Sequence, residues 1–213
     1  IFFDGEPITG LKPHRVVELG IARTFQSIRL FGKLPVLENV LAGRHCRMKA
    51  GLFACMLHTP GQRREEKAAV ARCMEELRFV GLADRRAEAA GGLSYGNQRL
   101  LEIARALASD PRLLILDEPA NFVDNKFEKE LYRTLHELNA RMAIVMVSHD
   151  IGTITSVVKE IVCVNRQVHR HRSNILTEEQ LRNYDCPIQL VSHGHIPHTV
   201  LEHHPGDCCR DHE

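Results

Sequence analysis

Two adjacent carboxylates follow a short apolar run in this sequence. The run covers residues 113–116, and Asp117 and Glu118 come directly after it. Such a run is typical of a strand buried in a parallel sheet, and α/β folds bind ligands at the carboxyl ends of such strands. Asp117 is then suited to hold Mg²⁺ through water, and Glu118 to accept a proton from an attacking water. The alternative interpretation is a surface turn without chemistry.

Two further segments carry residues suited to phosphate. Ser94 and Gly96, in the sequence LSYGNQ, stand at the start of a predicted helix, where backbone N–H groups and the helix dipole favour an anion. His149 follows the apolar run 143–147 and is therefore predicted at the same sheet edge, where an imidazole can bind a γ-phosphate. Each residue also has a plainer interpretation: Ser94 as an N-cap, Gly96 as a hinge and His149 as a capping residue.

The spacing of apolar residues predicts the elements that must position these side chains. Short apolar runs predict strands, which are expected at residues 1–3, 21–25, 113–116, 143–147 and 161–164. Helical spacing predicts helices at residues 13–19, from 36 onward, 61–80, from 94 to about 109, 125–139 and 151–158. Apolar strands that alternate with helices indicate an α/β fold with a parallel sheet covered on both faces.

These motifs, in this order, resemble the ATP-binding subunits of ABC transporters over about residues 1 to 165. The resemblance implies an ABC-type (RecA-like) P-loop ATPase core with an inserted helical subdomain, and ATP with Mg²⁺ as cofactors. It implies that LSYGNQ, which includes Gln98, is the signature loop and that LLILDE is the Walker B strand. It further implies that Asp124, in NFVD, belongs to the D-loop, that His149 is the switch histidine, and that Gln26, in ARTFQ, is the Q-loop glutamine.

The same resemblance implies an organisation and partners. The implied parts are a core segment with the Q-loop at 1–30, a helical subdomain at 31–92, a core segment with the remaining motifs at 93–165, and a histidine-rich tail at 166–213. A second ABC ATPase subunit is implied, as a homodimer or heterodimer, in which Ser94 and Gly96 serve the nucleotide held mainly by the partner. Integral membrane permease subunits are implied too, with this chain peripheral at the cytoplasmic face of the inner or plasma membrane.

Composition argues against other partners. Lys+Arg 28 against Asp+Glu 27 gives a formal charge of +1, without the basic stripe that nucleic acid requires. The apolar runs are far shorter than the ~20 residues that span a bilayer, so membrane association is expected through another subunit. The seven cysteines form no C-x-x-C pair, which favours free thiols in a reducing compartment.

One motif of the family is absent from the 213 residues. No G-x-x-x-x-G-K-[ST] occurs, although this loop holds the β- and γ-phosphates. We expect the loop, and the aromatic residue that stacks on adenine, to belong upstream of Ile1. The chain by itself is then expected to hydrolyse ATP negligibly. A competing hypothesis from another class is a catalytically incomplete fragment that dimerises or binds metal.

The two halves of the chain resemble different importers. Residues 1 to about 118, with GIARTFQSIRLF, are similar to ATPases of branched-chain amino-acid importers, whereas the half that begins with NFVDNKFEKELY is similar to ATPases of zinc or manganese importers. The changeover falls near residue 119. Because the Q-loop and the helical subdomain set the coupling to the permease and lie in the first half, amino acids are favoured as the solute, and the metal ions remain open.

The C-terminal tail is rich in metal-binding side chains. Eight of the 13 histidines lie at or beyond His169, and this tract could hold Zn²⁺. The candidate ligands are His193, His195, His198, His203 and His204. Their spacing matches no defined zinc motif, so a solvated tail is the favoured alternative.

Overall fold

The computed structural model describes residues 1–48, 59–121, 123–148, 157–165, 167–171, 188–193 and 196–201. The chain divides into an N-terminal unit, Ile1–Val147, and a C-terminal unit, Ser148–Glu213. Each unit has its own strands, and the predicted helix at 151–158 falls almost wholly outside the described residues. The motif residues that the structure describes with their side chains belong to the N-terminal unit.

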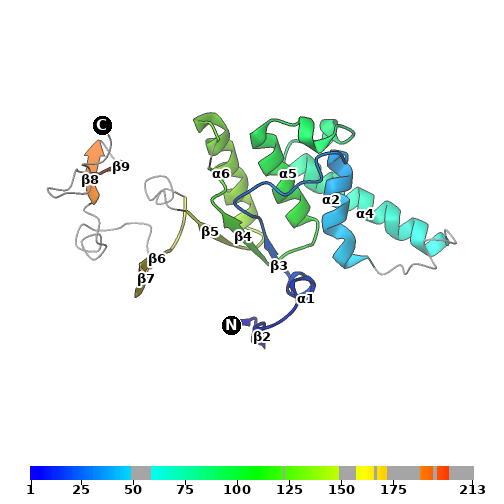
Figure 1. Ribbon diagram of the computed structural model, residues 1–213, viewed down its shortest axis with the longest axis horizontal. Helices are drawn as coiled ribbons and strands as arrows, with labels where there is room; N and C mark the ends of the chain where they lie inside the picture. The colour runs from blue at the N-terminus through cyan, green and yellow to red at the C-terminus, as the bar shows by residue number, and fades with distance from the viewer. Residues whose placement is uncertain are drawn as a thin grey trace, which may run out of the picture. The chain divides into compact units, whose positions relative to one another are not determined.

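A three-stranded parallel sheet organises the N-terminal unit (Figure 1). In the order of the sheet, its strands are β3 (Ile21–Arg23), β4 (Leu113–Asp117) and β5 (Ala143–Val147). The apolar runs predicted these strands, although β3 ends two residues before the predicted residue 25. Since all three strands run in one direction, their carboxyl ends share one edge, and Asp117 pairs in register with Val147.

Two helices cover one face of this sheet: α5 (Tyr95–Leu107) and α6 (Asn125–Asn139), the second with the predicted bounds. Leu114 and Leu116 of β4 are fully buried in the cluster that these helices form with the sheet. The opposite face differs from the prediction of a sheet covered on both sides. Val145 and Val147 are 48% and 51% exposed, because alternate side chains of β5 point away from α6 and the described residues place no helix over them.

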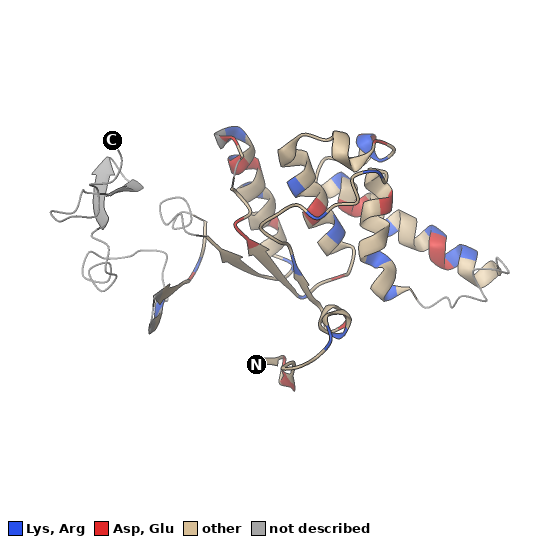
Figure 2. Ribbon diagram, viewed as in Figure 1, with Lys and Arg blue, Asp and Glu red and all other residues tan. Residues whose placement is uncertain are grey.

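A long helix, α4 (Pro60–Phe79), forms where the sequence predicted a helix at residues 61–80. It begins at Thr59, whose side chain accepts a hydrogen bond from the backbone N–H of Gln62, and Pro60 occupies the first turn. Acidic and basic residues are interspersed along it (Figure 2).

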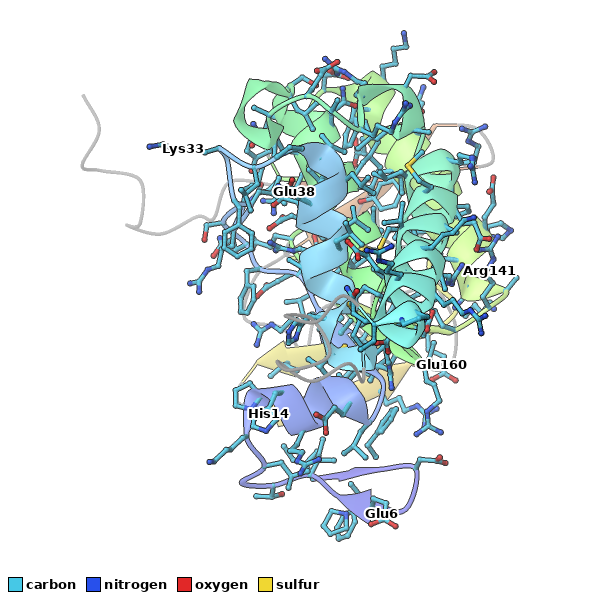
Figure 3. The ribbon with its side chains drawn as sticks, turned by 90° about the vertical axis from the view of Figure 1, so that its right-hand side faces the viewer. Glu6, His14, Lys33, Glu38, Arg141 and Glu160 are labelled. Atoms are coloured by element: carbon cyan, nitrogen blue, oxygen red, sulfur yellow. The ribbon has the colours of Figure 1, made fainter. Side chains whose placement is uncertain are left out.

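The N-terminal segment forms a small hairpin and a short helix. β1 (Phe2–Phe3) pairs with β2 (Glu6–Pro7) in antiparallel fashion, and α1 (Pro13–Glu18) comes next. Figure 3 shows Glu6 and His14 of these elements at the end of the unit away from Glu38 of the helical layer. Gly20, with a φ of 99°, turns the chain from α1 into β3.

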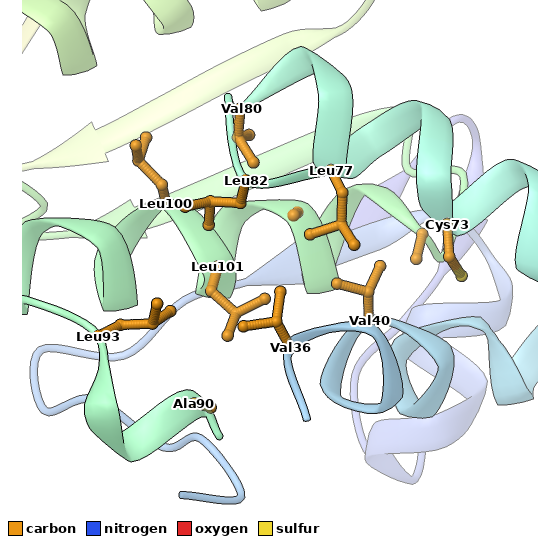
Figure 4. Packing of buried hydrophobic residues seen from close by; sticks show 12 residues of the cluster. Val36, Val40, Cys73, Leu77, Val80, Leu82, Ala90, Leu93, Leu100 and Leu101 are labelled. Carbon is orange, nitrogen blue, oxygen red and sulfur yellow. The ribbon is translucent and has the colours of Figure 1, made fainter. Parts of the chain in front are cut away.

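The helical layer packs around a second apolar cluster (Figure 4). α2 (Val36–Arg44) and α4 lie against α5, with Val40, Leu77 and Leu101 fully buried between them. The approach of α2 to α5 is close: a Cβ atom at Gly43 would stand 2.1 Å from the Arg105 carbonyl oxygen. Three short 3-10 helices connect these elements, at His45–Arg47 (η1), Ala83–Arg85 (η2) and Ala90–Gly92 (η3).

The C-terminal unit contains two antiparallel hairpins. β6 (Ile161–Asn165) pairs with β7 (Gln167–His171), and β8 (Ile188–His193) pairs with β9 (Ile196–Leu201). The sequence predicted a strand at 161–164, which is confirmed, and within its unit this strand pairs with β7. Since β7 begins two residues after β6 ends, the two strands form a local hairpin.

Candidate functional site

The carboxyl edge of the parallel sheet brings together Gln26 and Glu118, which are 92 residues apart in the chain. Gln26 Nε2 donates a hydrogen bond to Glu118 Oε2 at 3.0 Å. The same oxygen accepts a bond from Asn121 Nδ2 at 2.6 Å. The sequence named Gln26 as a site residue through the family resemblance, and the structure brings its side chain to Glu118. Asn121 was not singled out, although it lies in the same turn as the carboxylate.

The backbone at Glu118 has an unusual conformation. Its φ is 47°, in the left-handed region that costs a residue other than glycine about 1 kcal/mol or more. The Glu118 N–H donates to the carbonyl of Val147 at the end of β5, at 2.9 Å. This bond extends the parallel pairing by one residue beyond β4, so the conformation is held by the neighbouring strand.

Asp117 forms an ion pair that sequence reasoning missed. Arg23 Nη2, at the end of β3, lies 2.8 Å from Asp117 Oδ2. The Asp117 side chain is 24% exposed and that of Arg23 is 54% exposed, so the pair faces solvent. The signal for Arg23 was its place as the last residue of the neighbouring parallel strand, opposite Ile115.

The residues at this edge fit a hard cation. Carboxylate and amide oxygens are the donors that Mg²⁺ accepts, and Asp117, Glu118 and Gln26 supply them. Within the described ranges no three His, Cys, Asp or Glu side chains gather around one point. Mg²⁺ keeps several waters and binds through one or two carboxylates together with phosphate, so Asp117 and Glu118 fit this ion.

The signature residues form the first turn of α5. Ser94 Oγ accepts a bond from the backbone N–H of Asn97 at 3.4 Å, and Gln98 Nε2 donates to the Leu93 carbonyl at 3.0 Å. Both bonds are local to the loop, as the N-cap interpretation of Ser94 predicted. Gly96 lies against another element, because a Cβ atom there would meet the ring of Phe127 at 2.6 Å.

Asp124 has a well-defined local role. Its Oδ1 accepts a bond from the backbone N–H of Phe127 at 2.8 Å, which caps the amino end of α6. Since Phe127 packs against Gly96, the cap also fixes the contact between α6 and the signature turn. The segments predicted as D-loop and signature motif are therefore neighbours within the N-terminal unit.

Several predicted site residues lie outside the described side chains. His149 is one of them, although β5 ends two residues earlier, beside Asp117. The zinc candidates are in the same position: the backbones of His193 and His198 belong to β8 and β9, whereas His195, His203 and His204 fall outside the described residues altogether. The predicted sites at these histidines stay predictions.

A parallel sheet with Gln26, Asp117 and Glu118 at its carboxyl edge, beside a helical layer, is typical of α/β proteins that bind ligands at the carboxyl ends of their strands. The sequence profile described as "ABC transporter" matches residues 1–121. The chain belongs to the ABC transporter family. The α/β, ABC-type ATPase fold expected from the motifs is therefore confirmed.

Known proteins similar to the chain share this fold and family. The chain is 35% identical over 185 residues to the high-affinity branched-chain amino acid transport ATP-binding protein LivG of Escherichia coli (strain K12), covering 86% of the chain and 71% of LivG. It is 35% identical over 168 residues to BraF of Pseudomonas aeruginosa, covering 78% and 66%. The crystal structure of a nucleotide-free ATP-binding cassette from an ABC transporter superposes with a TM-score of 0.67 at 26% identity, covering 85% and 71%.

The helices that the structure describes are unsuited to crossing a bilayer. None of them is both long enough and apolar enough to do so.

Proposed function

We propose that this chain forms the nucleotide-hydrolysing part of an importer ATPase, and that its transporter takes up branched-chain amino acids. The observation that carries the proposal is the hydrogen bond from Gln26 to Glu118 at the carboxyl edge of the sheet. Similarity to LivG and BraF, whose names specify branched-chain amino acid transport, supports the solute. The Q-loop and the helical layer lie in the half of the chain that resembles these importers.

Glu118 is the proposed general base of ATP hydrolysis. Its Oε2 accepts bonds from Gln26 and Asn121, which hold the carboxylate in one orientation. An oriented carboxylate can accept a proton from a water molecule that attacks the γ-phosphate. Gln26 is placed to sense that water and the phosphate, because its side chain already reaches Glu118. In the same proposal His149 donates a hydrogen bond to the γ-phosphate.

Asp117 is the proposed partner of Mg²⁺, through a bound water. When bound, Mg²⁺ neutralises phosphate charge as it develops during the transfer. Arg23 holds the Asp117 carboxylate at the sheet edge through their ion pair. We expect this pair to keep the carboxylate oriented toward the site.

The position of the signature turn points to the partners. We propose that a second ATPase subunit supplies the remaining contacts, with Ser94, Gly96 and Gln98 serving the nucleotide bound mainly by that subunit. Asp124 caps the neighbouring helix and is proposed to lie at the same dimer contact. Permease subunits complete the transporter, and the chain is proposed to be peripheral at the cytoplasmic face of the membrane.

The missing phosphate loop and the second half of the chain bear on activity and solute. The 213 residues contain no G-x-x-x-x-G-K-[ST], so we propose that this chain by itself hydrolyses ATP negligibly, and its alternative role is a dimerising or metal-binding module. Residues from about 119 onward resemble zinc or manganese importers, so these ions are the alternative solutes. The histidines of the tail are the proposed ligands if the module binds Zn²⁺.

The test of the ATPase proposal is the activity of the full-length protein with and without Glu118→Gln. We expect the substitution to lower kcat by about a hundredfold or more, because it removes the proton acceptor and keeps the shape. Glu6→Gln is the control, since Glu6 is exposed on the hairpin away from the site. Activity that is absent in the unaltered protein, or equal in the Glu118→Gln variant, would contradict the proposal.

The solute is tested separately, in vesicles that contain the full transporter. We expect ATP-dependent uptake of radiolabelled leucine and no uptake of ⁶⁵Zn²⁺ or ⁵⁴Mn²⁺. The reverse result would assign the transporter to metal ions. Glu118→Gln serves as the control for uptake that does not depend on hydrolysis.

A further inference from the structure

The backbone that carries Gln26 is bonded to side chains of α5. The guanidinium of Arg99 donates from Nη1 to the Phe25 carbonyl at 2.9 Å and from Nη2 to the Gln26 carbonyl. The two nitrogens of one planar group therefore hold two consecutive carbonyls. Bidentate contacts of this kind fix orientation as well as distance.

The other end of the same loop is also held by α5. Glu102 Oε1 accepts a hydrogen bond from the Arg29 backbone N–H at 2.8 Å. Arg105 Nη1 donates to the Arg29 carbonyl at 2.6 Å. Residues 25–29 are thus bonded to α5 at both ends. The α5 residues that hold them, Arg99, Glu102 and Arg105, are spaced about one helical turn apart.

Arg99 and Glu102 are paired with each other in the interior. Their side chains are 4% and 2% exposed, and Arg99 Nη1 lies 3.1 Å from Glu102 Oε2. A buried ion pair contributes little net stability, because the desolvation of both charges offsets their attraction. A fixed geometry is the better explanation of such a pair, and here both partners use their remaining atoms on the loop.

Arg99 also reaches the signature sequence. Its Nη2 donates to the hydroxyl of Tyr95 at 2.9 Å, and its guanidinium carbon lies 5.3 Å from the centre of the Tyr95 ring. Tyr95 stands between Ser94 and Gly96 in LSYGNQ. One guanidinium therefore touches the signature turn on one side and the Gln26 carbonyl on the other.

The side chain of Gln26 donates a hydrogen bond to Glu118 Oε2 at 3.0 Å, so a chain of contacts leads from Tyr95 through Arg99 and Gln26 to Glu118. We infer that Arg99, paired with Glu102, is a positioning residue that fixes Gln26 to the signature helix, so that a displacement of α5 moves Gln26 relative to Glu118. Tyr95, Arg99 and Glu102 are called the Q-loop clamp below. The inference rests on the proposed ATPase function. It assigns the positioning of Gln26 to the clamp and not to Ser94 or Gly96.

A test must remove the clamp without leaving a buried charge. Arg99→Met alone would remove the guanidinium nearest to the buried Glu102 carboxylate and leave Arg105 3.8 Å away, which would destabilise the helix. The paired variant Arg99→Met/Glu102→Met, called the clamp variant below, removes both charges and keeps similar side-chain volumes. The matched control is Arg72→Met/Glu76→Met on α4, where Glu76 is 3% exposed and 2.6 Å from Arg72. Arg72 also pairs with Glu75 and Asp110, which lie outside residues 25–29.

The first measurement is hydrogen exchange of the amides of residues 25–29 in the full-length protein. We expect the clamp variant to exchange faster there, while β4 keeps its protection, and we expect no change at 25–29 in the control variant. Unchanged protection of 25–29 in the clamp variant would overturn the inference. This result does not depend on catalysis, so it decides the inference even if the protein proves not to be an ATPase.

The second measurement separates positioning from a general loss of structure. We expect the clamp variant to lower kcat by about tenfold to a hundredfold, with the KM for ATP changed less than about twofold. Adding Gln26→Ala to the clamp variant is expected to cause no further loss, since the clamp acts through Gln26. Additive losses, or a loss equal to that of the control variant, would overturn the inference.

Discussion

Gly96, in the first turn of α5, lies directly against the ring of Phe127 on α6. A Cβ atom at Gly96 would stand 2.6 Å from Phe127 Cδ2, closer than any real contact allows. The requirement for glycine in this signature motif is therefore partly a packing requirement. The contact between Gly96 and Phe127 joins the first turn of α5 to α6, the helix that follows Asp117 and Glu118 in the chain.

Gly96→Ala is accordingly expected to destabilise the protein by about 1 to 3 kcal/mol, because the ring must move or the helices must separate. Phe127→Ala makes room, so the Gly96→Ala penalty should shrink in that background. The measurement is urea unfolding of the two single variants and the double variant. Additive losses would show that Gly96 does not depend on Phe127.

The acidic residue at the end of α5 provides a pH test. Asp110 accepts hydrogen bonds from Arg44 and from Arg72 Nε, the latter at 3.2 Å. Burial alone would raise the pKa of Asp110, but the guanidiniums of Arg44 and Arg72 outweigh it and leave the pKa below its usual value of 3.8. A carboxyl with a lowered pKa stabilises the fold above pH 4 or so, and this contribution is lost as the pH falls through the folded-state pKa.

Asp110→Asn should therefore lower the free energy of unfolding at pH 7 by about 1 kcal/mol, a figure reduced for the partial exposure of the pair. The difference from the unaltered protein should shrink below about pH 4. Denaturant titrations at several pH values test this, with the exposed Asp84→Asn as the control. A difference that grows toward acid would contradict the assignment.

The pKa of Glu76, in the same cluster of charged side chains, is shifted in the opposite direction. Burial raises its pKa above 4.5, although Arg72 partly opposes the shift. A carboxyl with a raised pKa favours the fold at low pH, and this contribution is lost as the pH rises through the folded-state pKa. The comparison between Asp110→Asn and the unaltered protein is therefore more informative than the pH profile of either alone.

Cys73 provides a test of the helical core. Its side chain is fully buried in α4, and burial raises the pKa of its thiol to about 11. At pH 8 only about one thiol in a thousand is then ionised. We expect iodoacetamide to modify the partly exposed Cys46 in the native protein and to leave Cys73 unmodified until urea unfolds it. Equal labelling of both cysteines in the native protein, measured by peptide mass spectrometry, would contradict this packing.

The sequence predicted that Asp117 and Glu118 come at the carboxyl end of a strand in a parallel sheet. It named Gln26 as a site residue through the family resemblance, and the structure shows the hydrogen bond from Gln26 to Glu118. The pairings of Arg23 with Asp117 and of Arg99 with the Gln26 carbonyl were not predicted. From the sequence alone, a charged residue within a helix or strand is interpreted as a solvated side chain. Only the three-dimensional packing shows which backbone groups it contacts.

The fold was predicted in the same uneven way. The bounds of α6 were predictable from helical periodicity, which is a local property. The pairing of β6 with β7 was not predicted, because an apolar strand fits a parallel sheet and a hairpin equally well. The exposure of one face of β5 was likewise not predictable, because all residues of this strand are apolar.

Gln26 and Glu118 are proposed to form one catalytic unit at the sheet edge. A double-mutant cycle on kcat in the full-length protein tests this unit, with Gln26→Ala, Glu118→Gln and the two combined. We expect the combined variant to be no slower than Glu118→Gln alone, because Gln26 acts through the carboxylate. Independent losses that multiply in the combined variant would contradict the proposal.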